Sequence, residues 1–153
     1  MAFKKELIEL CSEIQMFEEL NEKEMLELSG RMTQSKFNSD SEIFKEGDPG
    51  DRMLIIANGA VEVLKERSHG SGKIVIARFG RGDIIGEASL IDRKVRSATV
   101  IATQPTTTYK LTRDDLNEIM INEKDIAVKL LLGLARLISL RLRNTSNWFV
   151  DVL

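Results

Sequence analysis

Apolar residues recur at helical spacing through the first segment of the chain, about residues 2–33. The first stripe with this spacing consists of Phe3, Leu7, Leu10 and Ile14. Asn21, followed three residues later by Glu24, resembles a capping box, so a second helix is expected to begin near Glu22. The buried stripe of this second helix would be Met25, Leu28 and Met32. The pattern therefore predicts two amphipathic helices before any strand.

The period changes in a second segment, about residues 35–111, where short runs rich in β-branched residues alternate with turn residues. The expected strands are 53–57, 60–64, 74–79, 98–103 and 107–111. Turn signals lie at 46–51, 58–59, 68–73 and 80–83. The pair Asn58 and Gly59 predicts a tight hairpin. Many short strands with glycine-rich turns favour an antiparallel sandwich or barrel.

The third segment, about residues 113–149, returns to helical spacing. A short helix is expected to open at Asp114 and Asp115, and a long helix follows a break at 122–125. One apolar stripe of the long helix consists of Leu131, Ala135, Ile138, Leu142, Thr145 and Phe149. A second stripe beside it consists of Leu130, Leu134 and Leu137. Gly133 lowers helix propensity and favours a close backbone approach at that point.

A helix that is apolar on two sides must be covered on two sides. One stripe can pack on the strands. The other is either buried within the same chain or packed against the same helix of a second copy, and its heptad-like spacing favours a homodimer. The predicted fold class is α+β: an antiparallel, jelly-roll-like β-barrel flanked by N-terminal helices and a long C-terminal helix.

Composition limits the partners and the cell compartment. The chain has 153 residues and a net charge of −2, which suits one domain and gives no general attraction to nucleic acid or an anionic membrane. Residues 1–30 carry a net charge of −5 and residues 124–153 a net charge of +3, which we interpret as two solvated helix faces. One cysteine, Cys11, and the polar start of the chain indicate a reducing compartment, so we expect a cytoplasmic protein without a membrane segment.

The residues that most enzymes need are missing from the sequence. The single histidine, His69, lies in a glycine- and serine-rich turn, and one histidine is too few for a histidine-based metal site. Cys11 lies on an apolar helix stripe and is expected in the core. Neither a nucleophile elbow nor a phosphate loop is present. We therefore expect a binding protein with no catalytic residue, no metal and no cofactor.

The segment "GEASLIDRKVRSAT", residues 86–99, holds the chemistry that remains. The run 87–91 has the length of one helical turn, whose free N–H groups suit an anionic oxygen. Arg96 can pair with a phosphate, and Ser97 adds a donor. Glu87 fits a ligand that also offers a sugar hydroxyl. The alternative is that Glu87 and Arg96 form a salt bridge that ties a loop to a strand.

Residues 86–100 resemble the phosphate-binding cassette of cyclic nucleotide-binding domains. The cassette positions are Gly86, Glu87, Ala88, Ser89, Leu90, Arg96, Ser97, Ala98 and Thr99. Residues 44–63 are similar to a second signature of that family, a Gly-Asp turn followed by a strand and a glycine hairpin. Residues 14–32 are similar to its helical lead-in. The resemblance covers about residues 14–149, nearly the whole chain.

The resemblance implies a role for each residue of the site. Arg96, Ser97 and the backbone N–H groups of Ala88 and Ser89 would hold the cyclic phosphate. Glu87 and the Gly86 backbone would hold the ribose 2′-hydroxyl. The residues expected near the base are Val63, Ile76, Thr145 and Ser146, of which the last two match a Thr-Ser pair in bacterial catabolite activators.

These observations predict a division of the chain into a helical lead-in at 1–33, a cyclic nucleotide-binding barrel at 34–112 and C-terminal helices at 113–153. The expected function is a non-enzymatic sensor that binds cyclic AMP more readily than cyclic GMP and moves its C-terminal helix. One alternative is a scaffold of the same fold without a ligand, and another is the effector-binding part of a transcription regulator. We expect no DNA-binding domain within these 153 residues, and we therefore predict no contact with nucleic acid.

Overall fold

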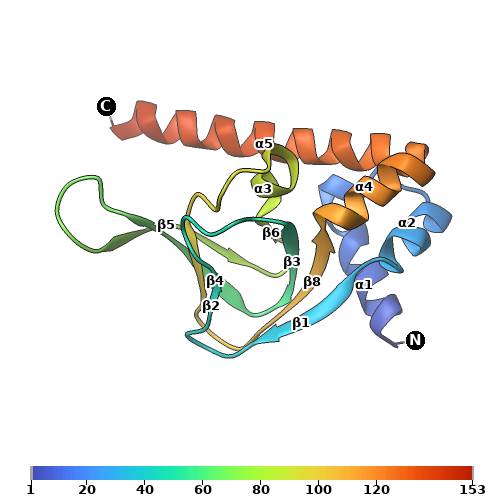
Figure 1. Ribbon diagram of the computed structural model, residues 1–153, viewed down its shortest axis with the longest axis horizontal. Helices are drawn as coiled ribbons and strands as arrows, with labels where there is room; N and C mark the ends of the chain where they lie inside the picture. The colour runs from blue at the N-terminus through green and yellow to red at the C-terminus, as the bar shows by residue number, and fades with distance from the viewer. Residues whose placement is uncertain (1, 153) are drawn as a thin grey trace.

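The computed structural model describes residues 2–152, with the side chains of Ala2 and of residues 4–145. Helices lie at both ends of the chain around a middle built of strands (Figure 1). The helices are α1 (Ala2–Ser12), the 3-10 helix η1 (Gln15–Phe17), α2 (Glu22–Ser29), α3 (Glu87–Asp92), α4 (Arg113–Asn122) and α5 (Lys124–Val152). The strands are β1 (Thr33–Phe37), β2 (Glu42–Phe44), β3 (Arg52–Asn58), β4 (Ala60–Glu66), β5 (Lys73–Gly80), β6 (Ile84–Ile85), β7 (Thr99–Ala102) and β8 (Thr106–Thr112).

Helix α2 begins at the predicted capping box. The Glu24 backbone N–H donates to Asn21 Oδ1 at 2.9 Å, and the Asn21 N–H donates to Glu24 Oε1 at 3.1 Å. Two donors that a helix start leaves free are satisfied in this way. The predicted stripes are buried at Leu7 and Leu10 of α1 and at Met25 and Leu28 of α2, as is Cys11. Met32 is also buried but lies after the end of α2, and the Phe3 side chain lies outside the described residues.

The strands form two four-stranded sheets, with the orders β1-β8-β3-β6 and β2-β7-β4-β5. Every pairing within the sheets is antiparallel. Within residues 2–152 the edge strands of one sheet do not pair with those of the other, so the sheets form a sandwich and not a closed barrel. The α+β class and the jelly-roll-like antiparallel architecture are confirmed, with this correction of barrel to sandwich.

The predicted hairpin at Asn58 and Gly59 is wrong. Strand β3, which ends at Asn58, pairs with β6 and β8, whereas β4 begins after the turn and pairs with β5 and β7. The turn is a corner at which the chain passes from one sheet to the other. Gly59 has a φ of +102°, and a Cβ there would lie 2.4 Å from Thr106 Oγ1. The tight corner requires glycine. A hairpin turn requires the same residue, so the two cannot be told apart from the local sequence.

Strand β3 is buried on both faces and separates two apolar cores. Met53 and Ile55 belong to a core shared with the helices, whereas Leu54 and Ile56 face the interior of the sandwich. The sandwich core consists of Phe44, Leu54, Ile56, Val61, Ile85 and Val100. The alternation of the pleat explains why residues 53–56 read as one continuous apolar run.

Helix α5 lies along one side of the molecule, over α3 and the sandwich (Figure 1). It follows α4 after a break at Glu123, close to the predicted position. Leu130 and Leu134 are buried, whereas Ala135, Ile138 and Leu142 of the other stripe are exposed, Leu142 at 66 %. Thus α5 presents an apolar stripe to solvent in the single chain. None of the helices in the described part is long and apolar enough to cross a membrane.

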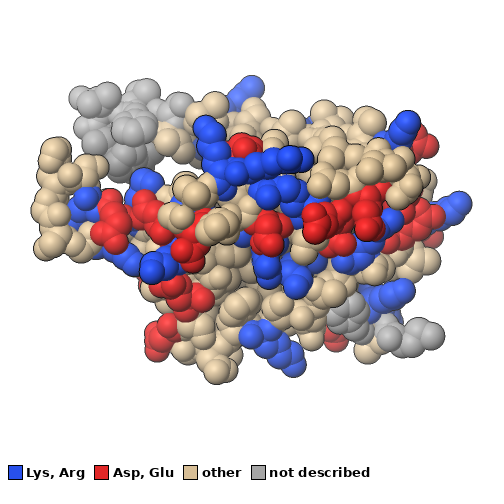
Figure 2. Space-filling model, viewed as in Figure 1, with Lys and Arg blue, Asp and Glu red and all other residues tan. Residues whose placement is uncertain are grey.

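Ion pairs join the acidic N-terminal segment to the basic C-terminal helix. Lys129 Nζ lies 2.7 Å from Glu24 Oε1, and Arg136 Nη1 lies 3.3 Å from Glu18 Oε1 and 3.0 Å from Glu19 Oε1. Lysines and arginines are accordingly interspersed with acidic side chains across the face that Figure 2 shows. Part of the uneven charge of the sequence is therefore neutralised within the fold.

Candidate functional site

The cassette segment turns from β6 into α3 at Gly86, which caps the short helix with a φ of +79°. A Cβ at this position would lie 2.6 Å from Arg96 Nη1, 2.8 Å from Phe44 Cε2 and 2.9 Å from the Arg52 carbonyl oxygen. Both the conformation and the crowding require glycine. Gly86 therefore brings the start of α3 against the Arg96 side chain. Helix α3 agrees with the single helical turn predicted from residues 87–91.

Arg96 is buried, with 5 % of its surface exposed. Its Nη1 donates to the Gly86 carbonyl at 3.2 Å and its Nη2 to the Arg52 carbonyl at 2.8 Å. The guanidinium carbon lies 3.6 Å from the centre of the Phe44 ring. Burial lowers the pKa of Arg96 to about 10, which still leaves the side chain protonated at neutral pH. Among the described residues Arg96 has no carboxylate within ion-pair distance, although Asp51 and Glu87 lie close enough to act on its charge.

Glu87, the first residue of α3, pairs with a residue of α5. Its Oε1 lies 2.6 Å from Arg141 Nη1, and the two side chains are only 12 % and 28 % exposed. Arg141 Nη2 also donates to the Ile84 carbonyl, and the guanidinium lies 4.9 Å from the Phe79 ring centre. Glu87 and Arg96 form no ion pair with each other in the part of the chain that the structure describes. The salt-bridge alternative for these two residues is therefore wrong.

A cavity of about 140 Å³ lies between the cassette, the sandwich and α5. Seven of the ten predicted site residues line it: Val63, Gly86, Glu87, Ala88, Ser89, Arg96 and Ser97. Ile76 of β5 does not line it and is 52 % exposed. Thr145 is exposed and donates from its hydroxyl to the Arg141 carbonyl at 2.9 Å, and the Ser146 side chain lies outside the described residues. The roles of all ten stay predictions.

Two basic residues from outside the cassette hold its carbonyl groups. Arg113, the first residue of α4, donates from Nη2 to the carbonyls of Ser89 and Gly50. Lys65 of β4 donates from Nζ to the Ser97 carbonyl at 2.6 Å. Such charge-assisted bonds are stronger than neutral ones and fix the backbone on both sides of the cavity. Arg113, like Arg96, makes no ion pair among the described residues, and the two positive charges act on each other.

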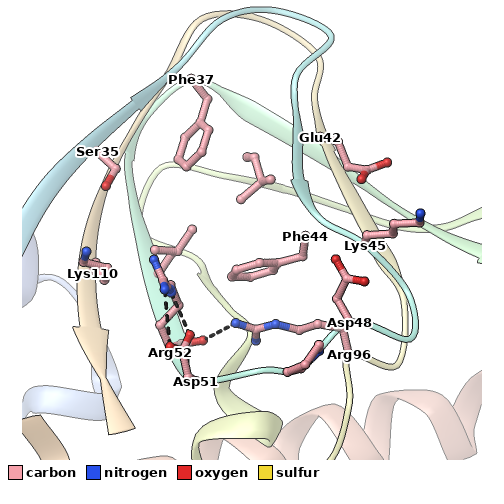
Figure 3. A pocket seen from close by; sticks show the side chains of 13 residues that line it. Ser35, Phe37, Glu42, Phe44, Lys45, Asp48, Asp51, Arg52, Arg96 and Lys110 are labelled. Atoms are coloured by element: carbon pink, nitrogen blue, oxygen red, sulfur yellow. Dashed lines mark hydrogen bonds and ion pairs between the residues drawn. The ribbon is translucent and has the colours of Figure 1, made fainter. Parts of the chain in front are cut away.

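A second cavity, of about 330 Å³, lies on the other side of Phe44 and Arg96 (Figure 3). Asp51 and Arg52 at its edge bind each other, with Arg52 Nε 2.8 Å from Asp51 Oδ1. The Arg52 hydrogen bond holds the pKa of Asp51 below its ordinary value. Asp51 and Arg52 are thus paired with each other, whereas Arg96, which also lines this cavity, makes no ion pair among the described residues.

The sequence reasoning missed five residues that line the cassette cavity: Phe44, Phe79, Ile85, Val100 and Arg141. A signal for Arg141 was present, since it lies four residues before Thr145 and such residues share a helix face. The phenylalanines had no such signal, because an apolar residue in a strand is explained by the core alone.

Comparison with known proteins identifies the family. A family model described as cyclic nucleotide-binding domain matches residues 34–123. A cyclic nucleotide-binding domain from Methylobacillus flagellatus KT is 32% identical, with a TM-score of 0.90, over 99% of this chain and 85% of that one. The chain belongs to the cyclic nucleotide-binding domain family, whose members are ligand-binding regulatory domains.

Two further structures place the fold among known regulators. The catabolite activator protein of Thermus thermophilus is 25% identical, with a TM-score of 0.78, over 90% of this chain and 62% of that one. The regulatory domain of Toxoplasma gondii protein kinase A, crystallised with cyclic AMP, is 21% identical, with a TM-score of 0.72, over 84% of this chain and 49% of that one. The second likeness concerns the fold alone.

Proposed function

We propose that this protein binds a cyclic nucleotide in the cavity beside the cassette and acts as a sensor without catalytic activity. The observation that carries the proposal is Arg96, a buried guanidinium without a carboxylate partner among the described residues. A buried charge without a counter-charge is costly, and an anionic ligand supplies the counter-charge. A cyclic phosphodiester carries a single negative charge at neutral pH, which matches a single guanidinium.

The proposed contacts follow the cassette. Arg96 and Ser97, with the N–H groups of Ala88 and Ser89, hold the phosphate. Glu87 accepts a hydrogen bond from the ribose 2′-hydroxyl, and the Gly86 backbone lies beside it. Val63 lies in the cavity wall, where it can contact the base. The contacts of Ile76, Thr145 and Ser146 with the base require these residues to come closer to the cavity than Ile76 and Thr145 now lie.

The size of the cavity supports a response of α5 to the ligand. Ligand pockets usually measure roughly 300–1,000 Å³, and the cassette cavity has about 140 Å³. Arg141 of α5 lines this cavity and forms an ion pair with Glu87. A nucleotide whose ribose bonds to Glu87 competes with Arg141, so binding and the position of α5 are coupled through one carboxylate.

Three finer points belong to the same proposal. Cyclic AMP is the preferred ligand, with cyclic GMP as the competitor because Ser97 can also contact a guanine amine. The exposed stripe of α5 joins two copies of the chain as a homodimer. The composition, with its single cysteine, makes the cytoplasm the expected compartment.

Of the two alternatives, the ligand-free scaffold rested on a bond between Glu87 and Arg96. Glu87 instead pairs with Arg141, so the bond that this alternative included is not formed. The effector-binding part of a transcription regulator is compatible with the likeness to the Thermus activator. It shares the ligand proposed above and differs only in the output.

Calorimetric titration with cyclic AMP and cyclic GMP tests the proposal. The wild type should bind one nucleotide per chain, and Arg96→Ala should weaken binding by about 30- to several-thousand-fold, because truncating one partner of a buried charge pair costs about 2–5 kcal/mol. The control is Arg31→Ala, which removes ion pairs to Glu118 and Glu123 far from the cassette and should retain the wild-type affinity. Absence of binding to the wild type, or equal affinity in Arg96→Ala, would overturn the proposal.

A further inference from the structure

Phe44 occupies the position next to a buried arginine where a carboxylate is usually found. The guanidinium carbon of Arg96 lies 3.6 Å from the ring centre, and the two residues are 5 % and 9 % exposed. Figure 3 shows the ring beside the guanidinium. Buried arginines are ordinarily paired with an acid. Here an aromatic face provides the electrostatic contact, and it does so without adding a negative charge.

The two kinds of partner have different consequences for an incoming anion. A carboxylate would take up in-plane N–H donors and neutralise the charge. A ring packed against the flat side of the guanidinium leaves the donors at its edge. Arginine has five N–H donors, and the carbonyls of Gly86 and Arg52 use two of them, so 5 − 2 = 3 remain. Three donors of Arg96 thus have no hydrogen-bond partner among the described residues.

The Phe44 ring is itself held in place. It belongs to the sandwich core with Leu54 and Val100, and its Cε2 lies 2.8 Å from the point that a Cβ of Gly86 would occupy. The missing side chain of Gly86 therefore makes room for the ring as well as for Arg96. A packed aromatic side chain in this setting has little freedom to turn away from the cation.

Arg141 provides an internal comparison. It also lies by a phenylalanine, with 4.9 Å from its guanidinium carbon to the Phe79 ring centre, but it pairs with Glu87 at 2.6 Å. Its charge is compensated by that carboxylate. Of the two arginines that line the cassette cavity, only Arg96 lacks an ion pair among the described residues.

We infer that Phe44 is a positioning residue for anion recognition, which holds the Arg96 guanidinium with its charge and in-plane donors free for the phosphate. The inference rests on the proposed function. Without the ring, the guanidinium is free to turn toward Asp51 or Glu87, both of which act on its charge already. The ligand would then have to compete with a carboxylate for Arg96.

The first experiment compares two phenylalanine variants by calorimetric titration with cyclic AMP. Phe44→Leu should weaken binding by about 5- to 30-fold, the change that corresponds to one desolvated cation–π contact. Phe37→Leu is the matched control, because Phe37 packs against the same core cluster and lies away from Arg96 across the second cavity (Figure 3). It should bind as the wild type does. Phe44→Tyr keeps the aromatic face and should restore most of the affinity.

A second measurement separates the electrostatic role of the ring from its packing. Replacing Phe44 by mono- and trifluorinated phenylalanine preserves the shape but progressively weakens the negative face of the ring, so affinity should fall in the order of fluorine content. This series remains informative if Phe44→Leu does not fold. Equal affinity across the series, or equal losses in Phe44→Leu and Phe37→Leu, overturns the inference. If the wild type binds no cyclic nucleotide, the proposed function fails first and this inference with it.

Discussion

Gly133 marks the place where α5 lies closest to the N-terminal segment. A Cβ at this position would lie 2.0 Å from the Met16 carbonyl oxygen, 2.9 Å from the Met16 carbonyl carbon and 3.1 Å from its Cγ. Real Cβ atoms essentially never approach another atom within 3.0 Å. Gly133→Ala must therefore move α5 away from η1 by at least about 1 Å, the difference between 3.0 and 2.0 Å. The nearest atoms belong to the backbone, so a side-chain rotation gives no relief.

The free-energy change has two opposing contributions. Overpacking a well-packed contact costs about 1–3 kcal/mol. Alanine in a helix interior is favoured over glycine by about 1 kcal/mol. Because the contact is with backbone, the cost lies in the upper part of its range, and the net loss of unfolding free energy is about 1–2 kcal/mol. For a chain of 153 residues this lowers Tm by about 2–8 °C.

Urea denaturation followed by circular dichroism measures the change in unfolding free energy, and a thermal scan gives Tm. Gly80→Ala is the control, because a Cβ there would have only an ordinary contact, 3.7 Å from the Gly59 carbonyl oxygen. It should leave stability unchanged or slightly raised. If Gly133→Ala is as stable as the wild type or more so, helix propensity outweighs the contact and the reasoning about α5 packing against η1 is wrong.

Three further predictions concern other parts of the chain. Burial raises the pKa of Cys11 to about 12, so a disulfide reagent at pH 8 should leave the native thiol unmodified and react once urea unfolds the chain; fast labelling of the native protein would contradict its burial. The Lys129 hydrogen bond, followed by the Asn21 backbone, lowers the pKa of Glu24 in the folded state, so this pair stabilises the fold above the ordinary glutamate pKa and the contribution is lost as pH falls below it. Denaturation at pH 6 and pH 4 should show that the unfolding free energy falls less on acidification in Lys129→Met than in the wild type. Equal decreases in the two proteins would disprove the link. Ile138→Glu should shift a dimer toward monomer in analytical ultracentrifugation, whereas Leu140→Glu, at an exposed position outside the stripe, should not; a wild type that is monomeric at high concentration would refute the dimer.

Local sequence signals were sufficient to predict most of the helices and strands. The capping box at Asn21 and Glu24 and the break before α5 depend on neighbouring residues only, and both are confirmed. The corner at Gly59 was misjudged because a glycine with positive φ serves a hairpin and a change of sheet equally well. Which sheet a strand joins depends on distant partners, such as β8 for β3. Alternation along a single strand carries no information about them.

The same distinction separates the parts of the site that the sequence indicated from those it did not. The cassette is contiguous, so its glycine, carboxylate and arginine could be identified together from residues 86–99. Phe44 and Phe79 enter the cavity from separate strands, and Arg141 enters from a helix 54 residues beyond Glu87 in the chain, 141 − 87. Their chemistry is visible only when folding has placed them next to Arg96 and Glu87.

Helix α5 is attached to the rest of the molecule in two different ways. Its first half is fixed by buried residues, with Leu130 and Leu134 in the core and Gly133 against η1. Beyond Leu134 none of the described side chains of α5 is buried, and the polar contact with the cassette is the one that Arg141 makes with Glu87. On the proposed function, a ribose hydroxyl that takes over Glu87 breaks this contact, while the ion pairs of Arg136 with Glu18 and Glu19 hold α5 up to that residue. The pivot then lies beyond Arg136, and the segment that moves carries Ile138 and Leu142 of the exposed stripe proposed to join the second subunit.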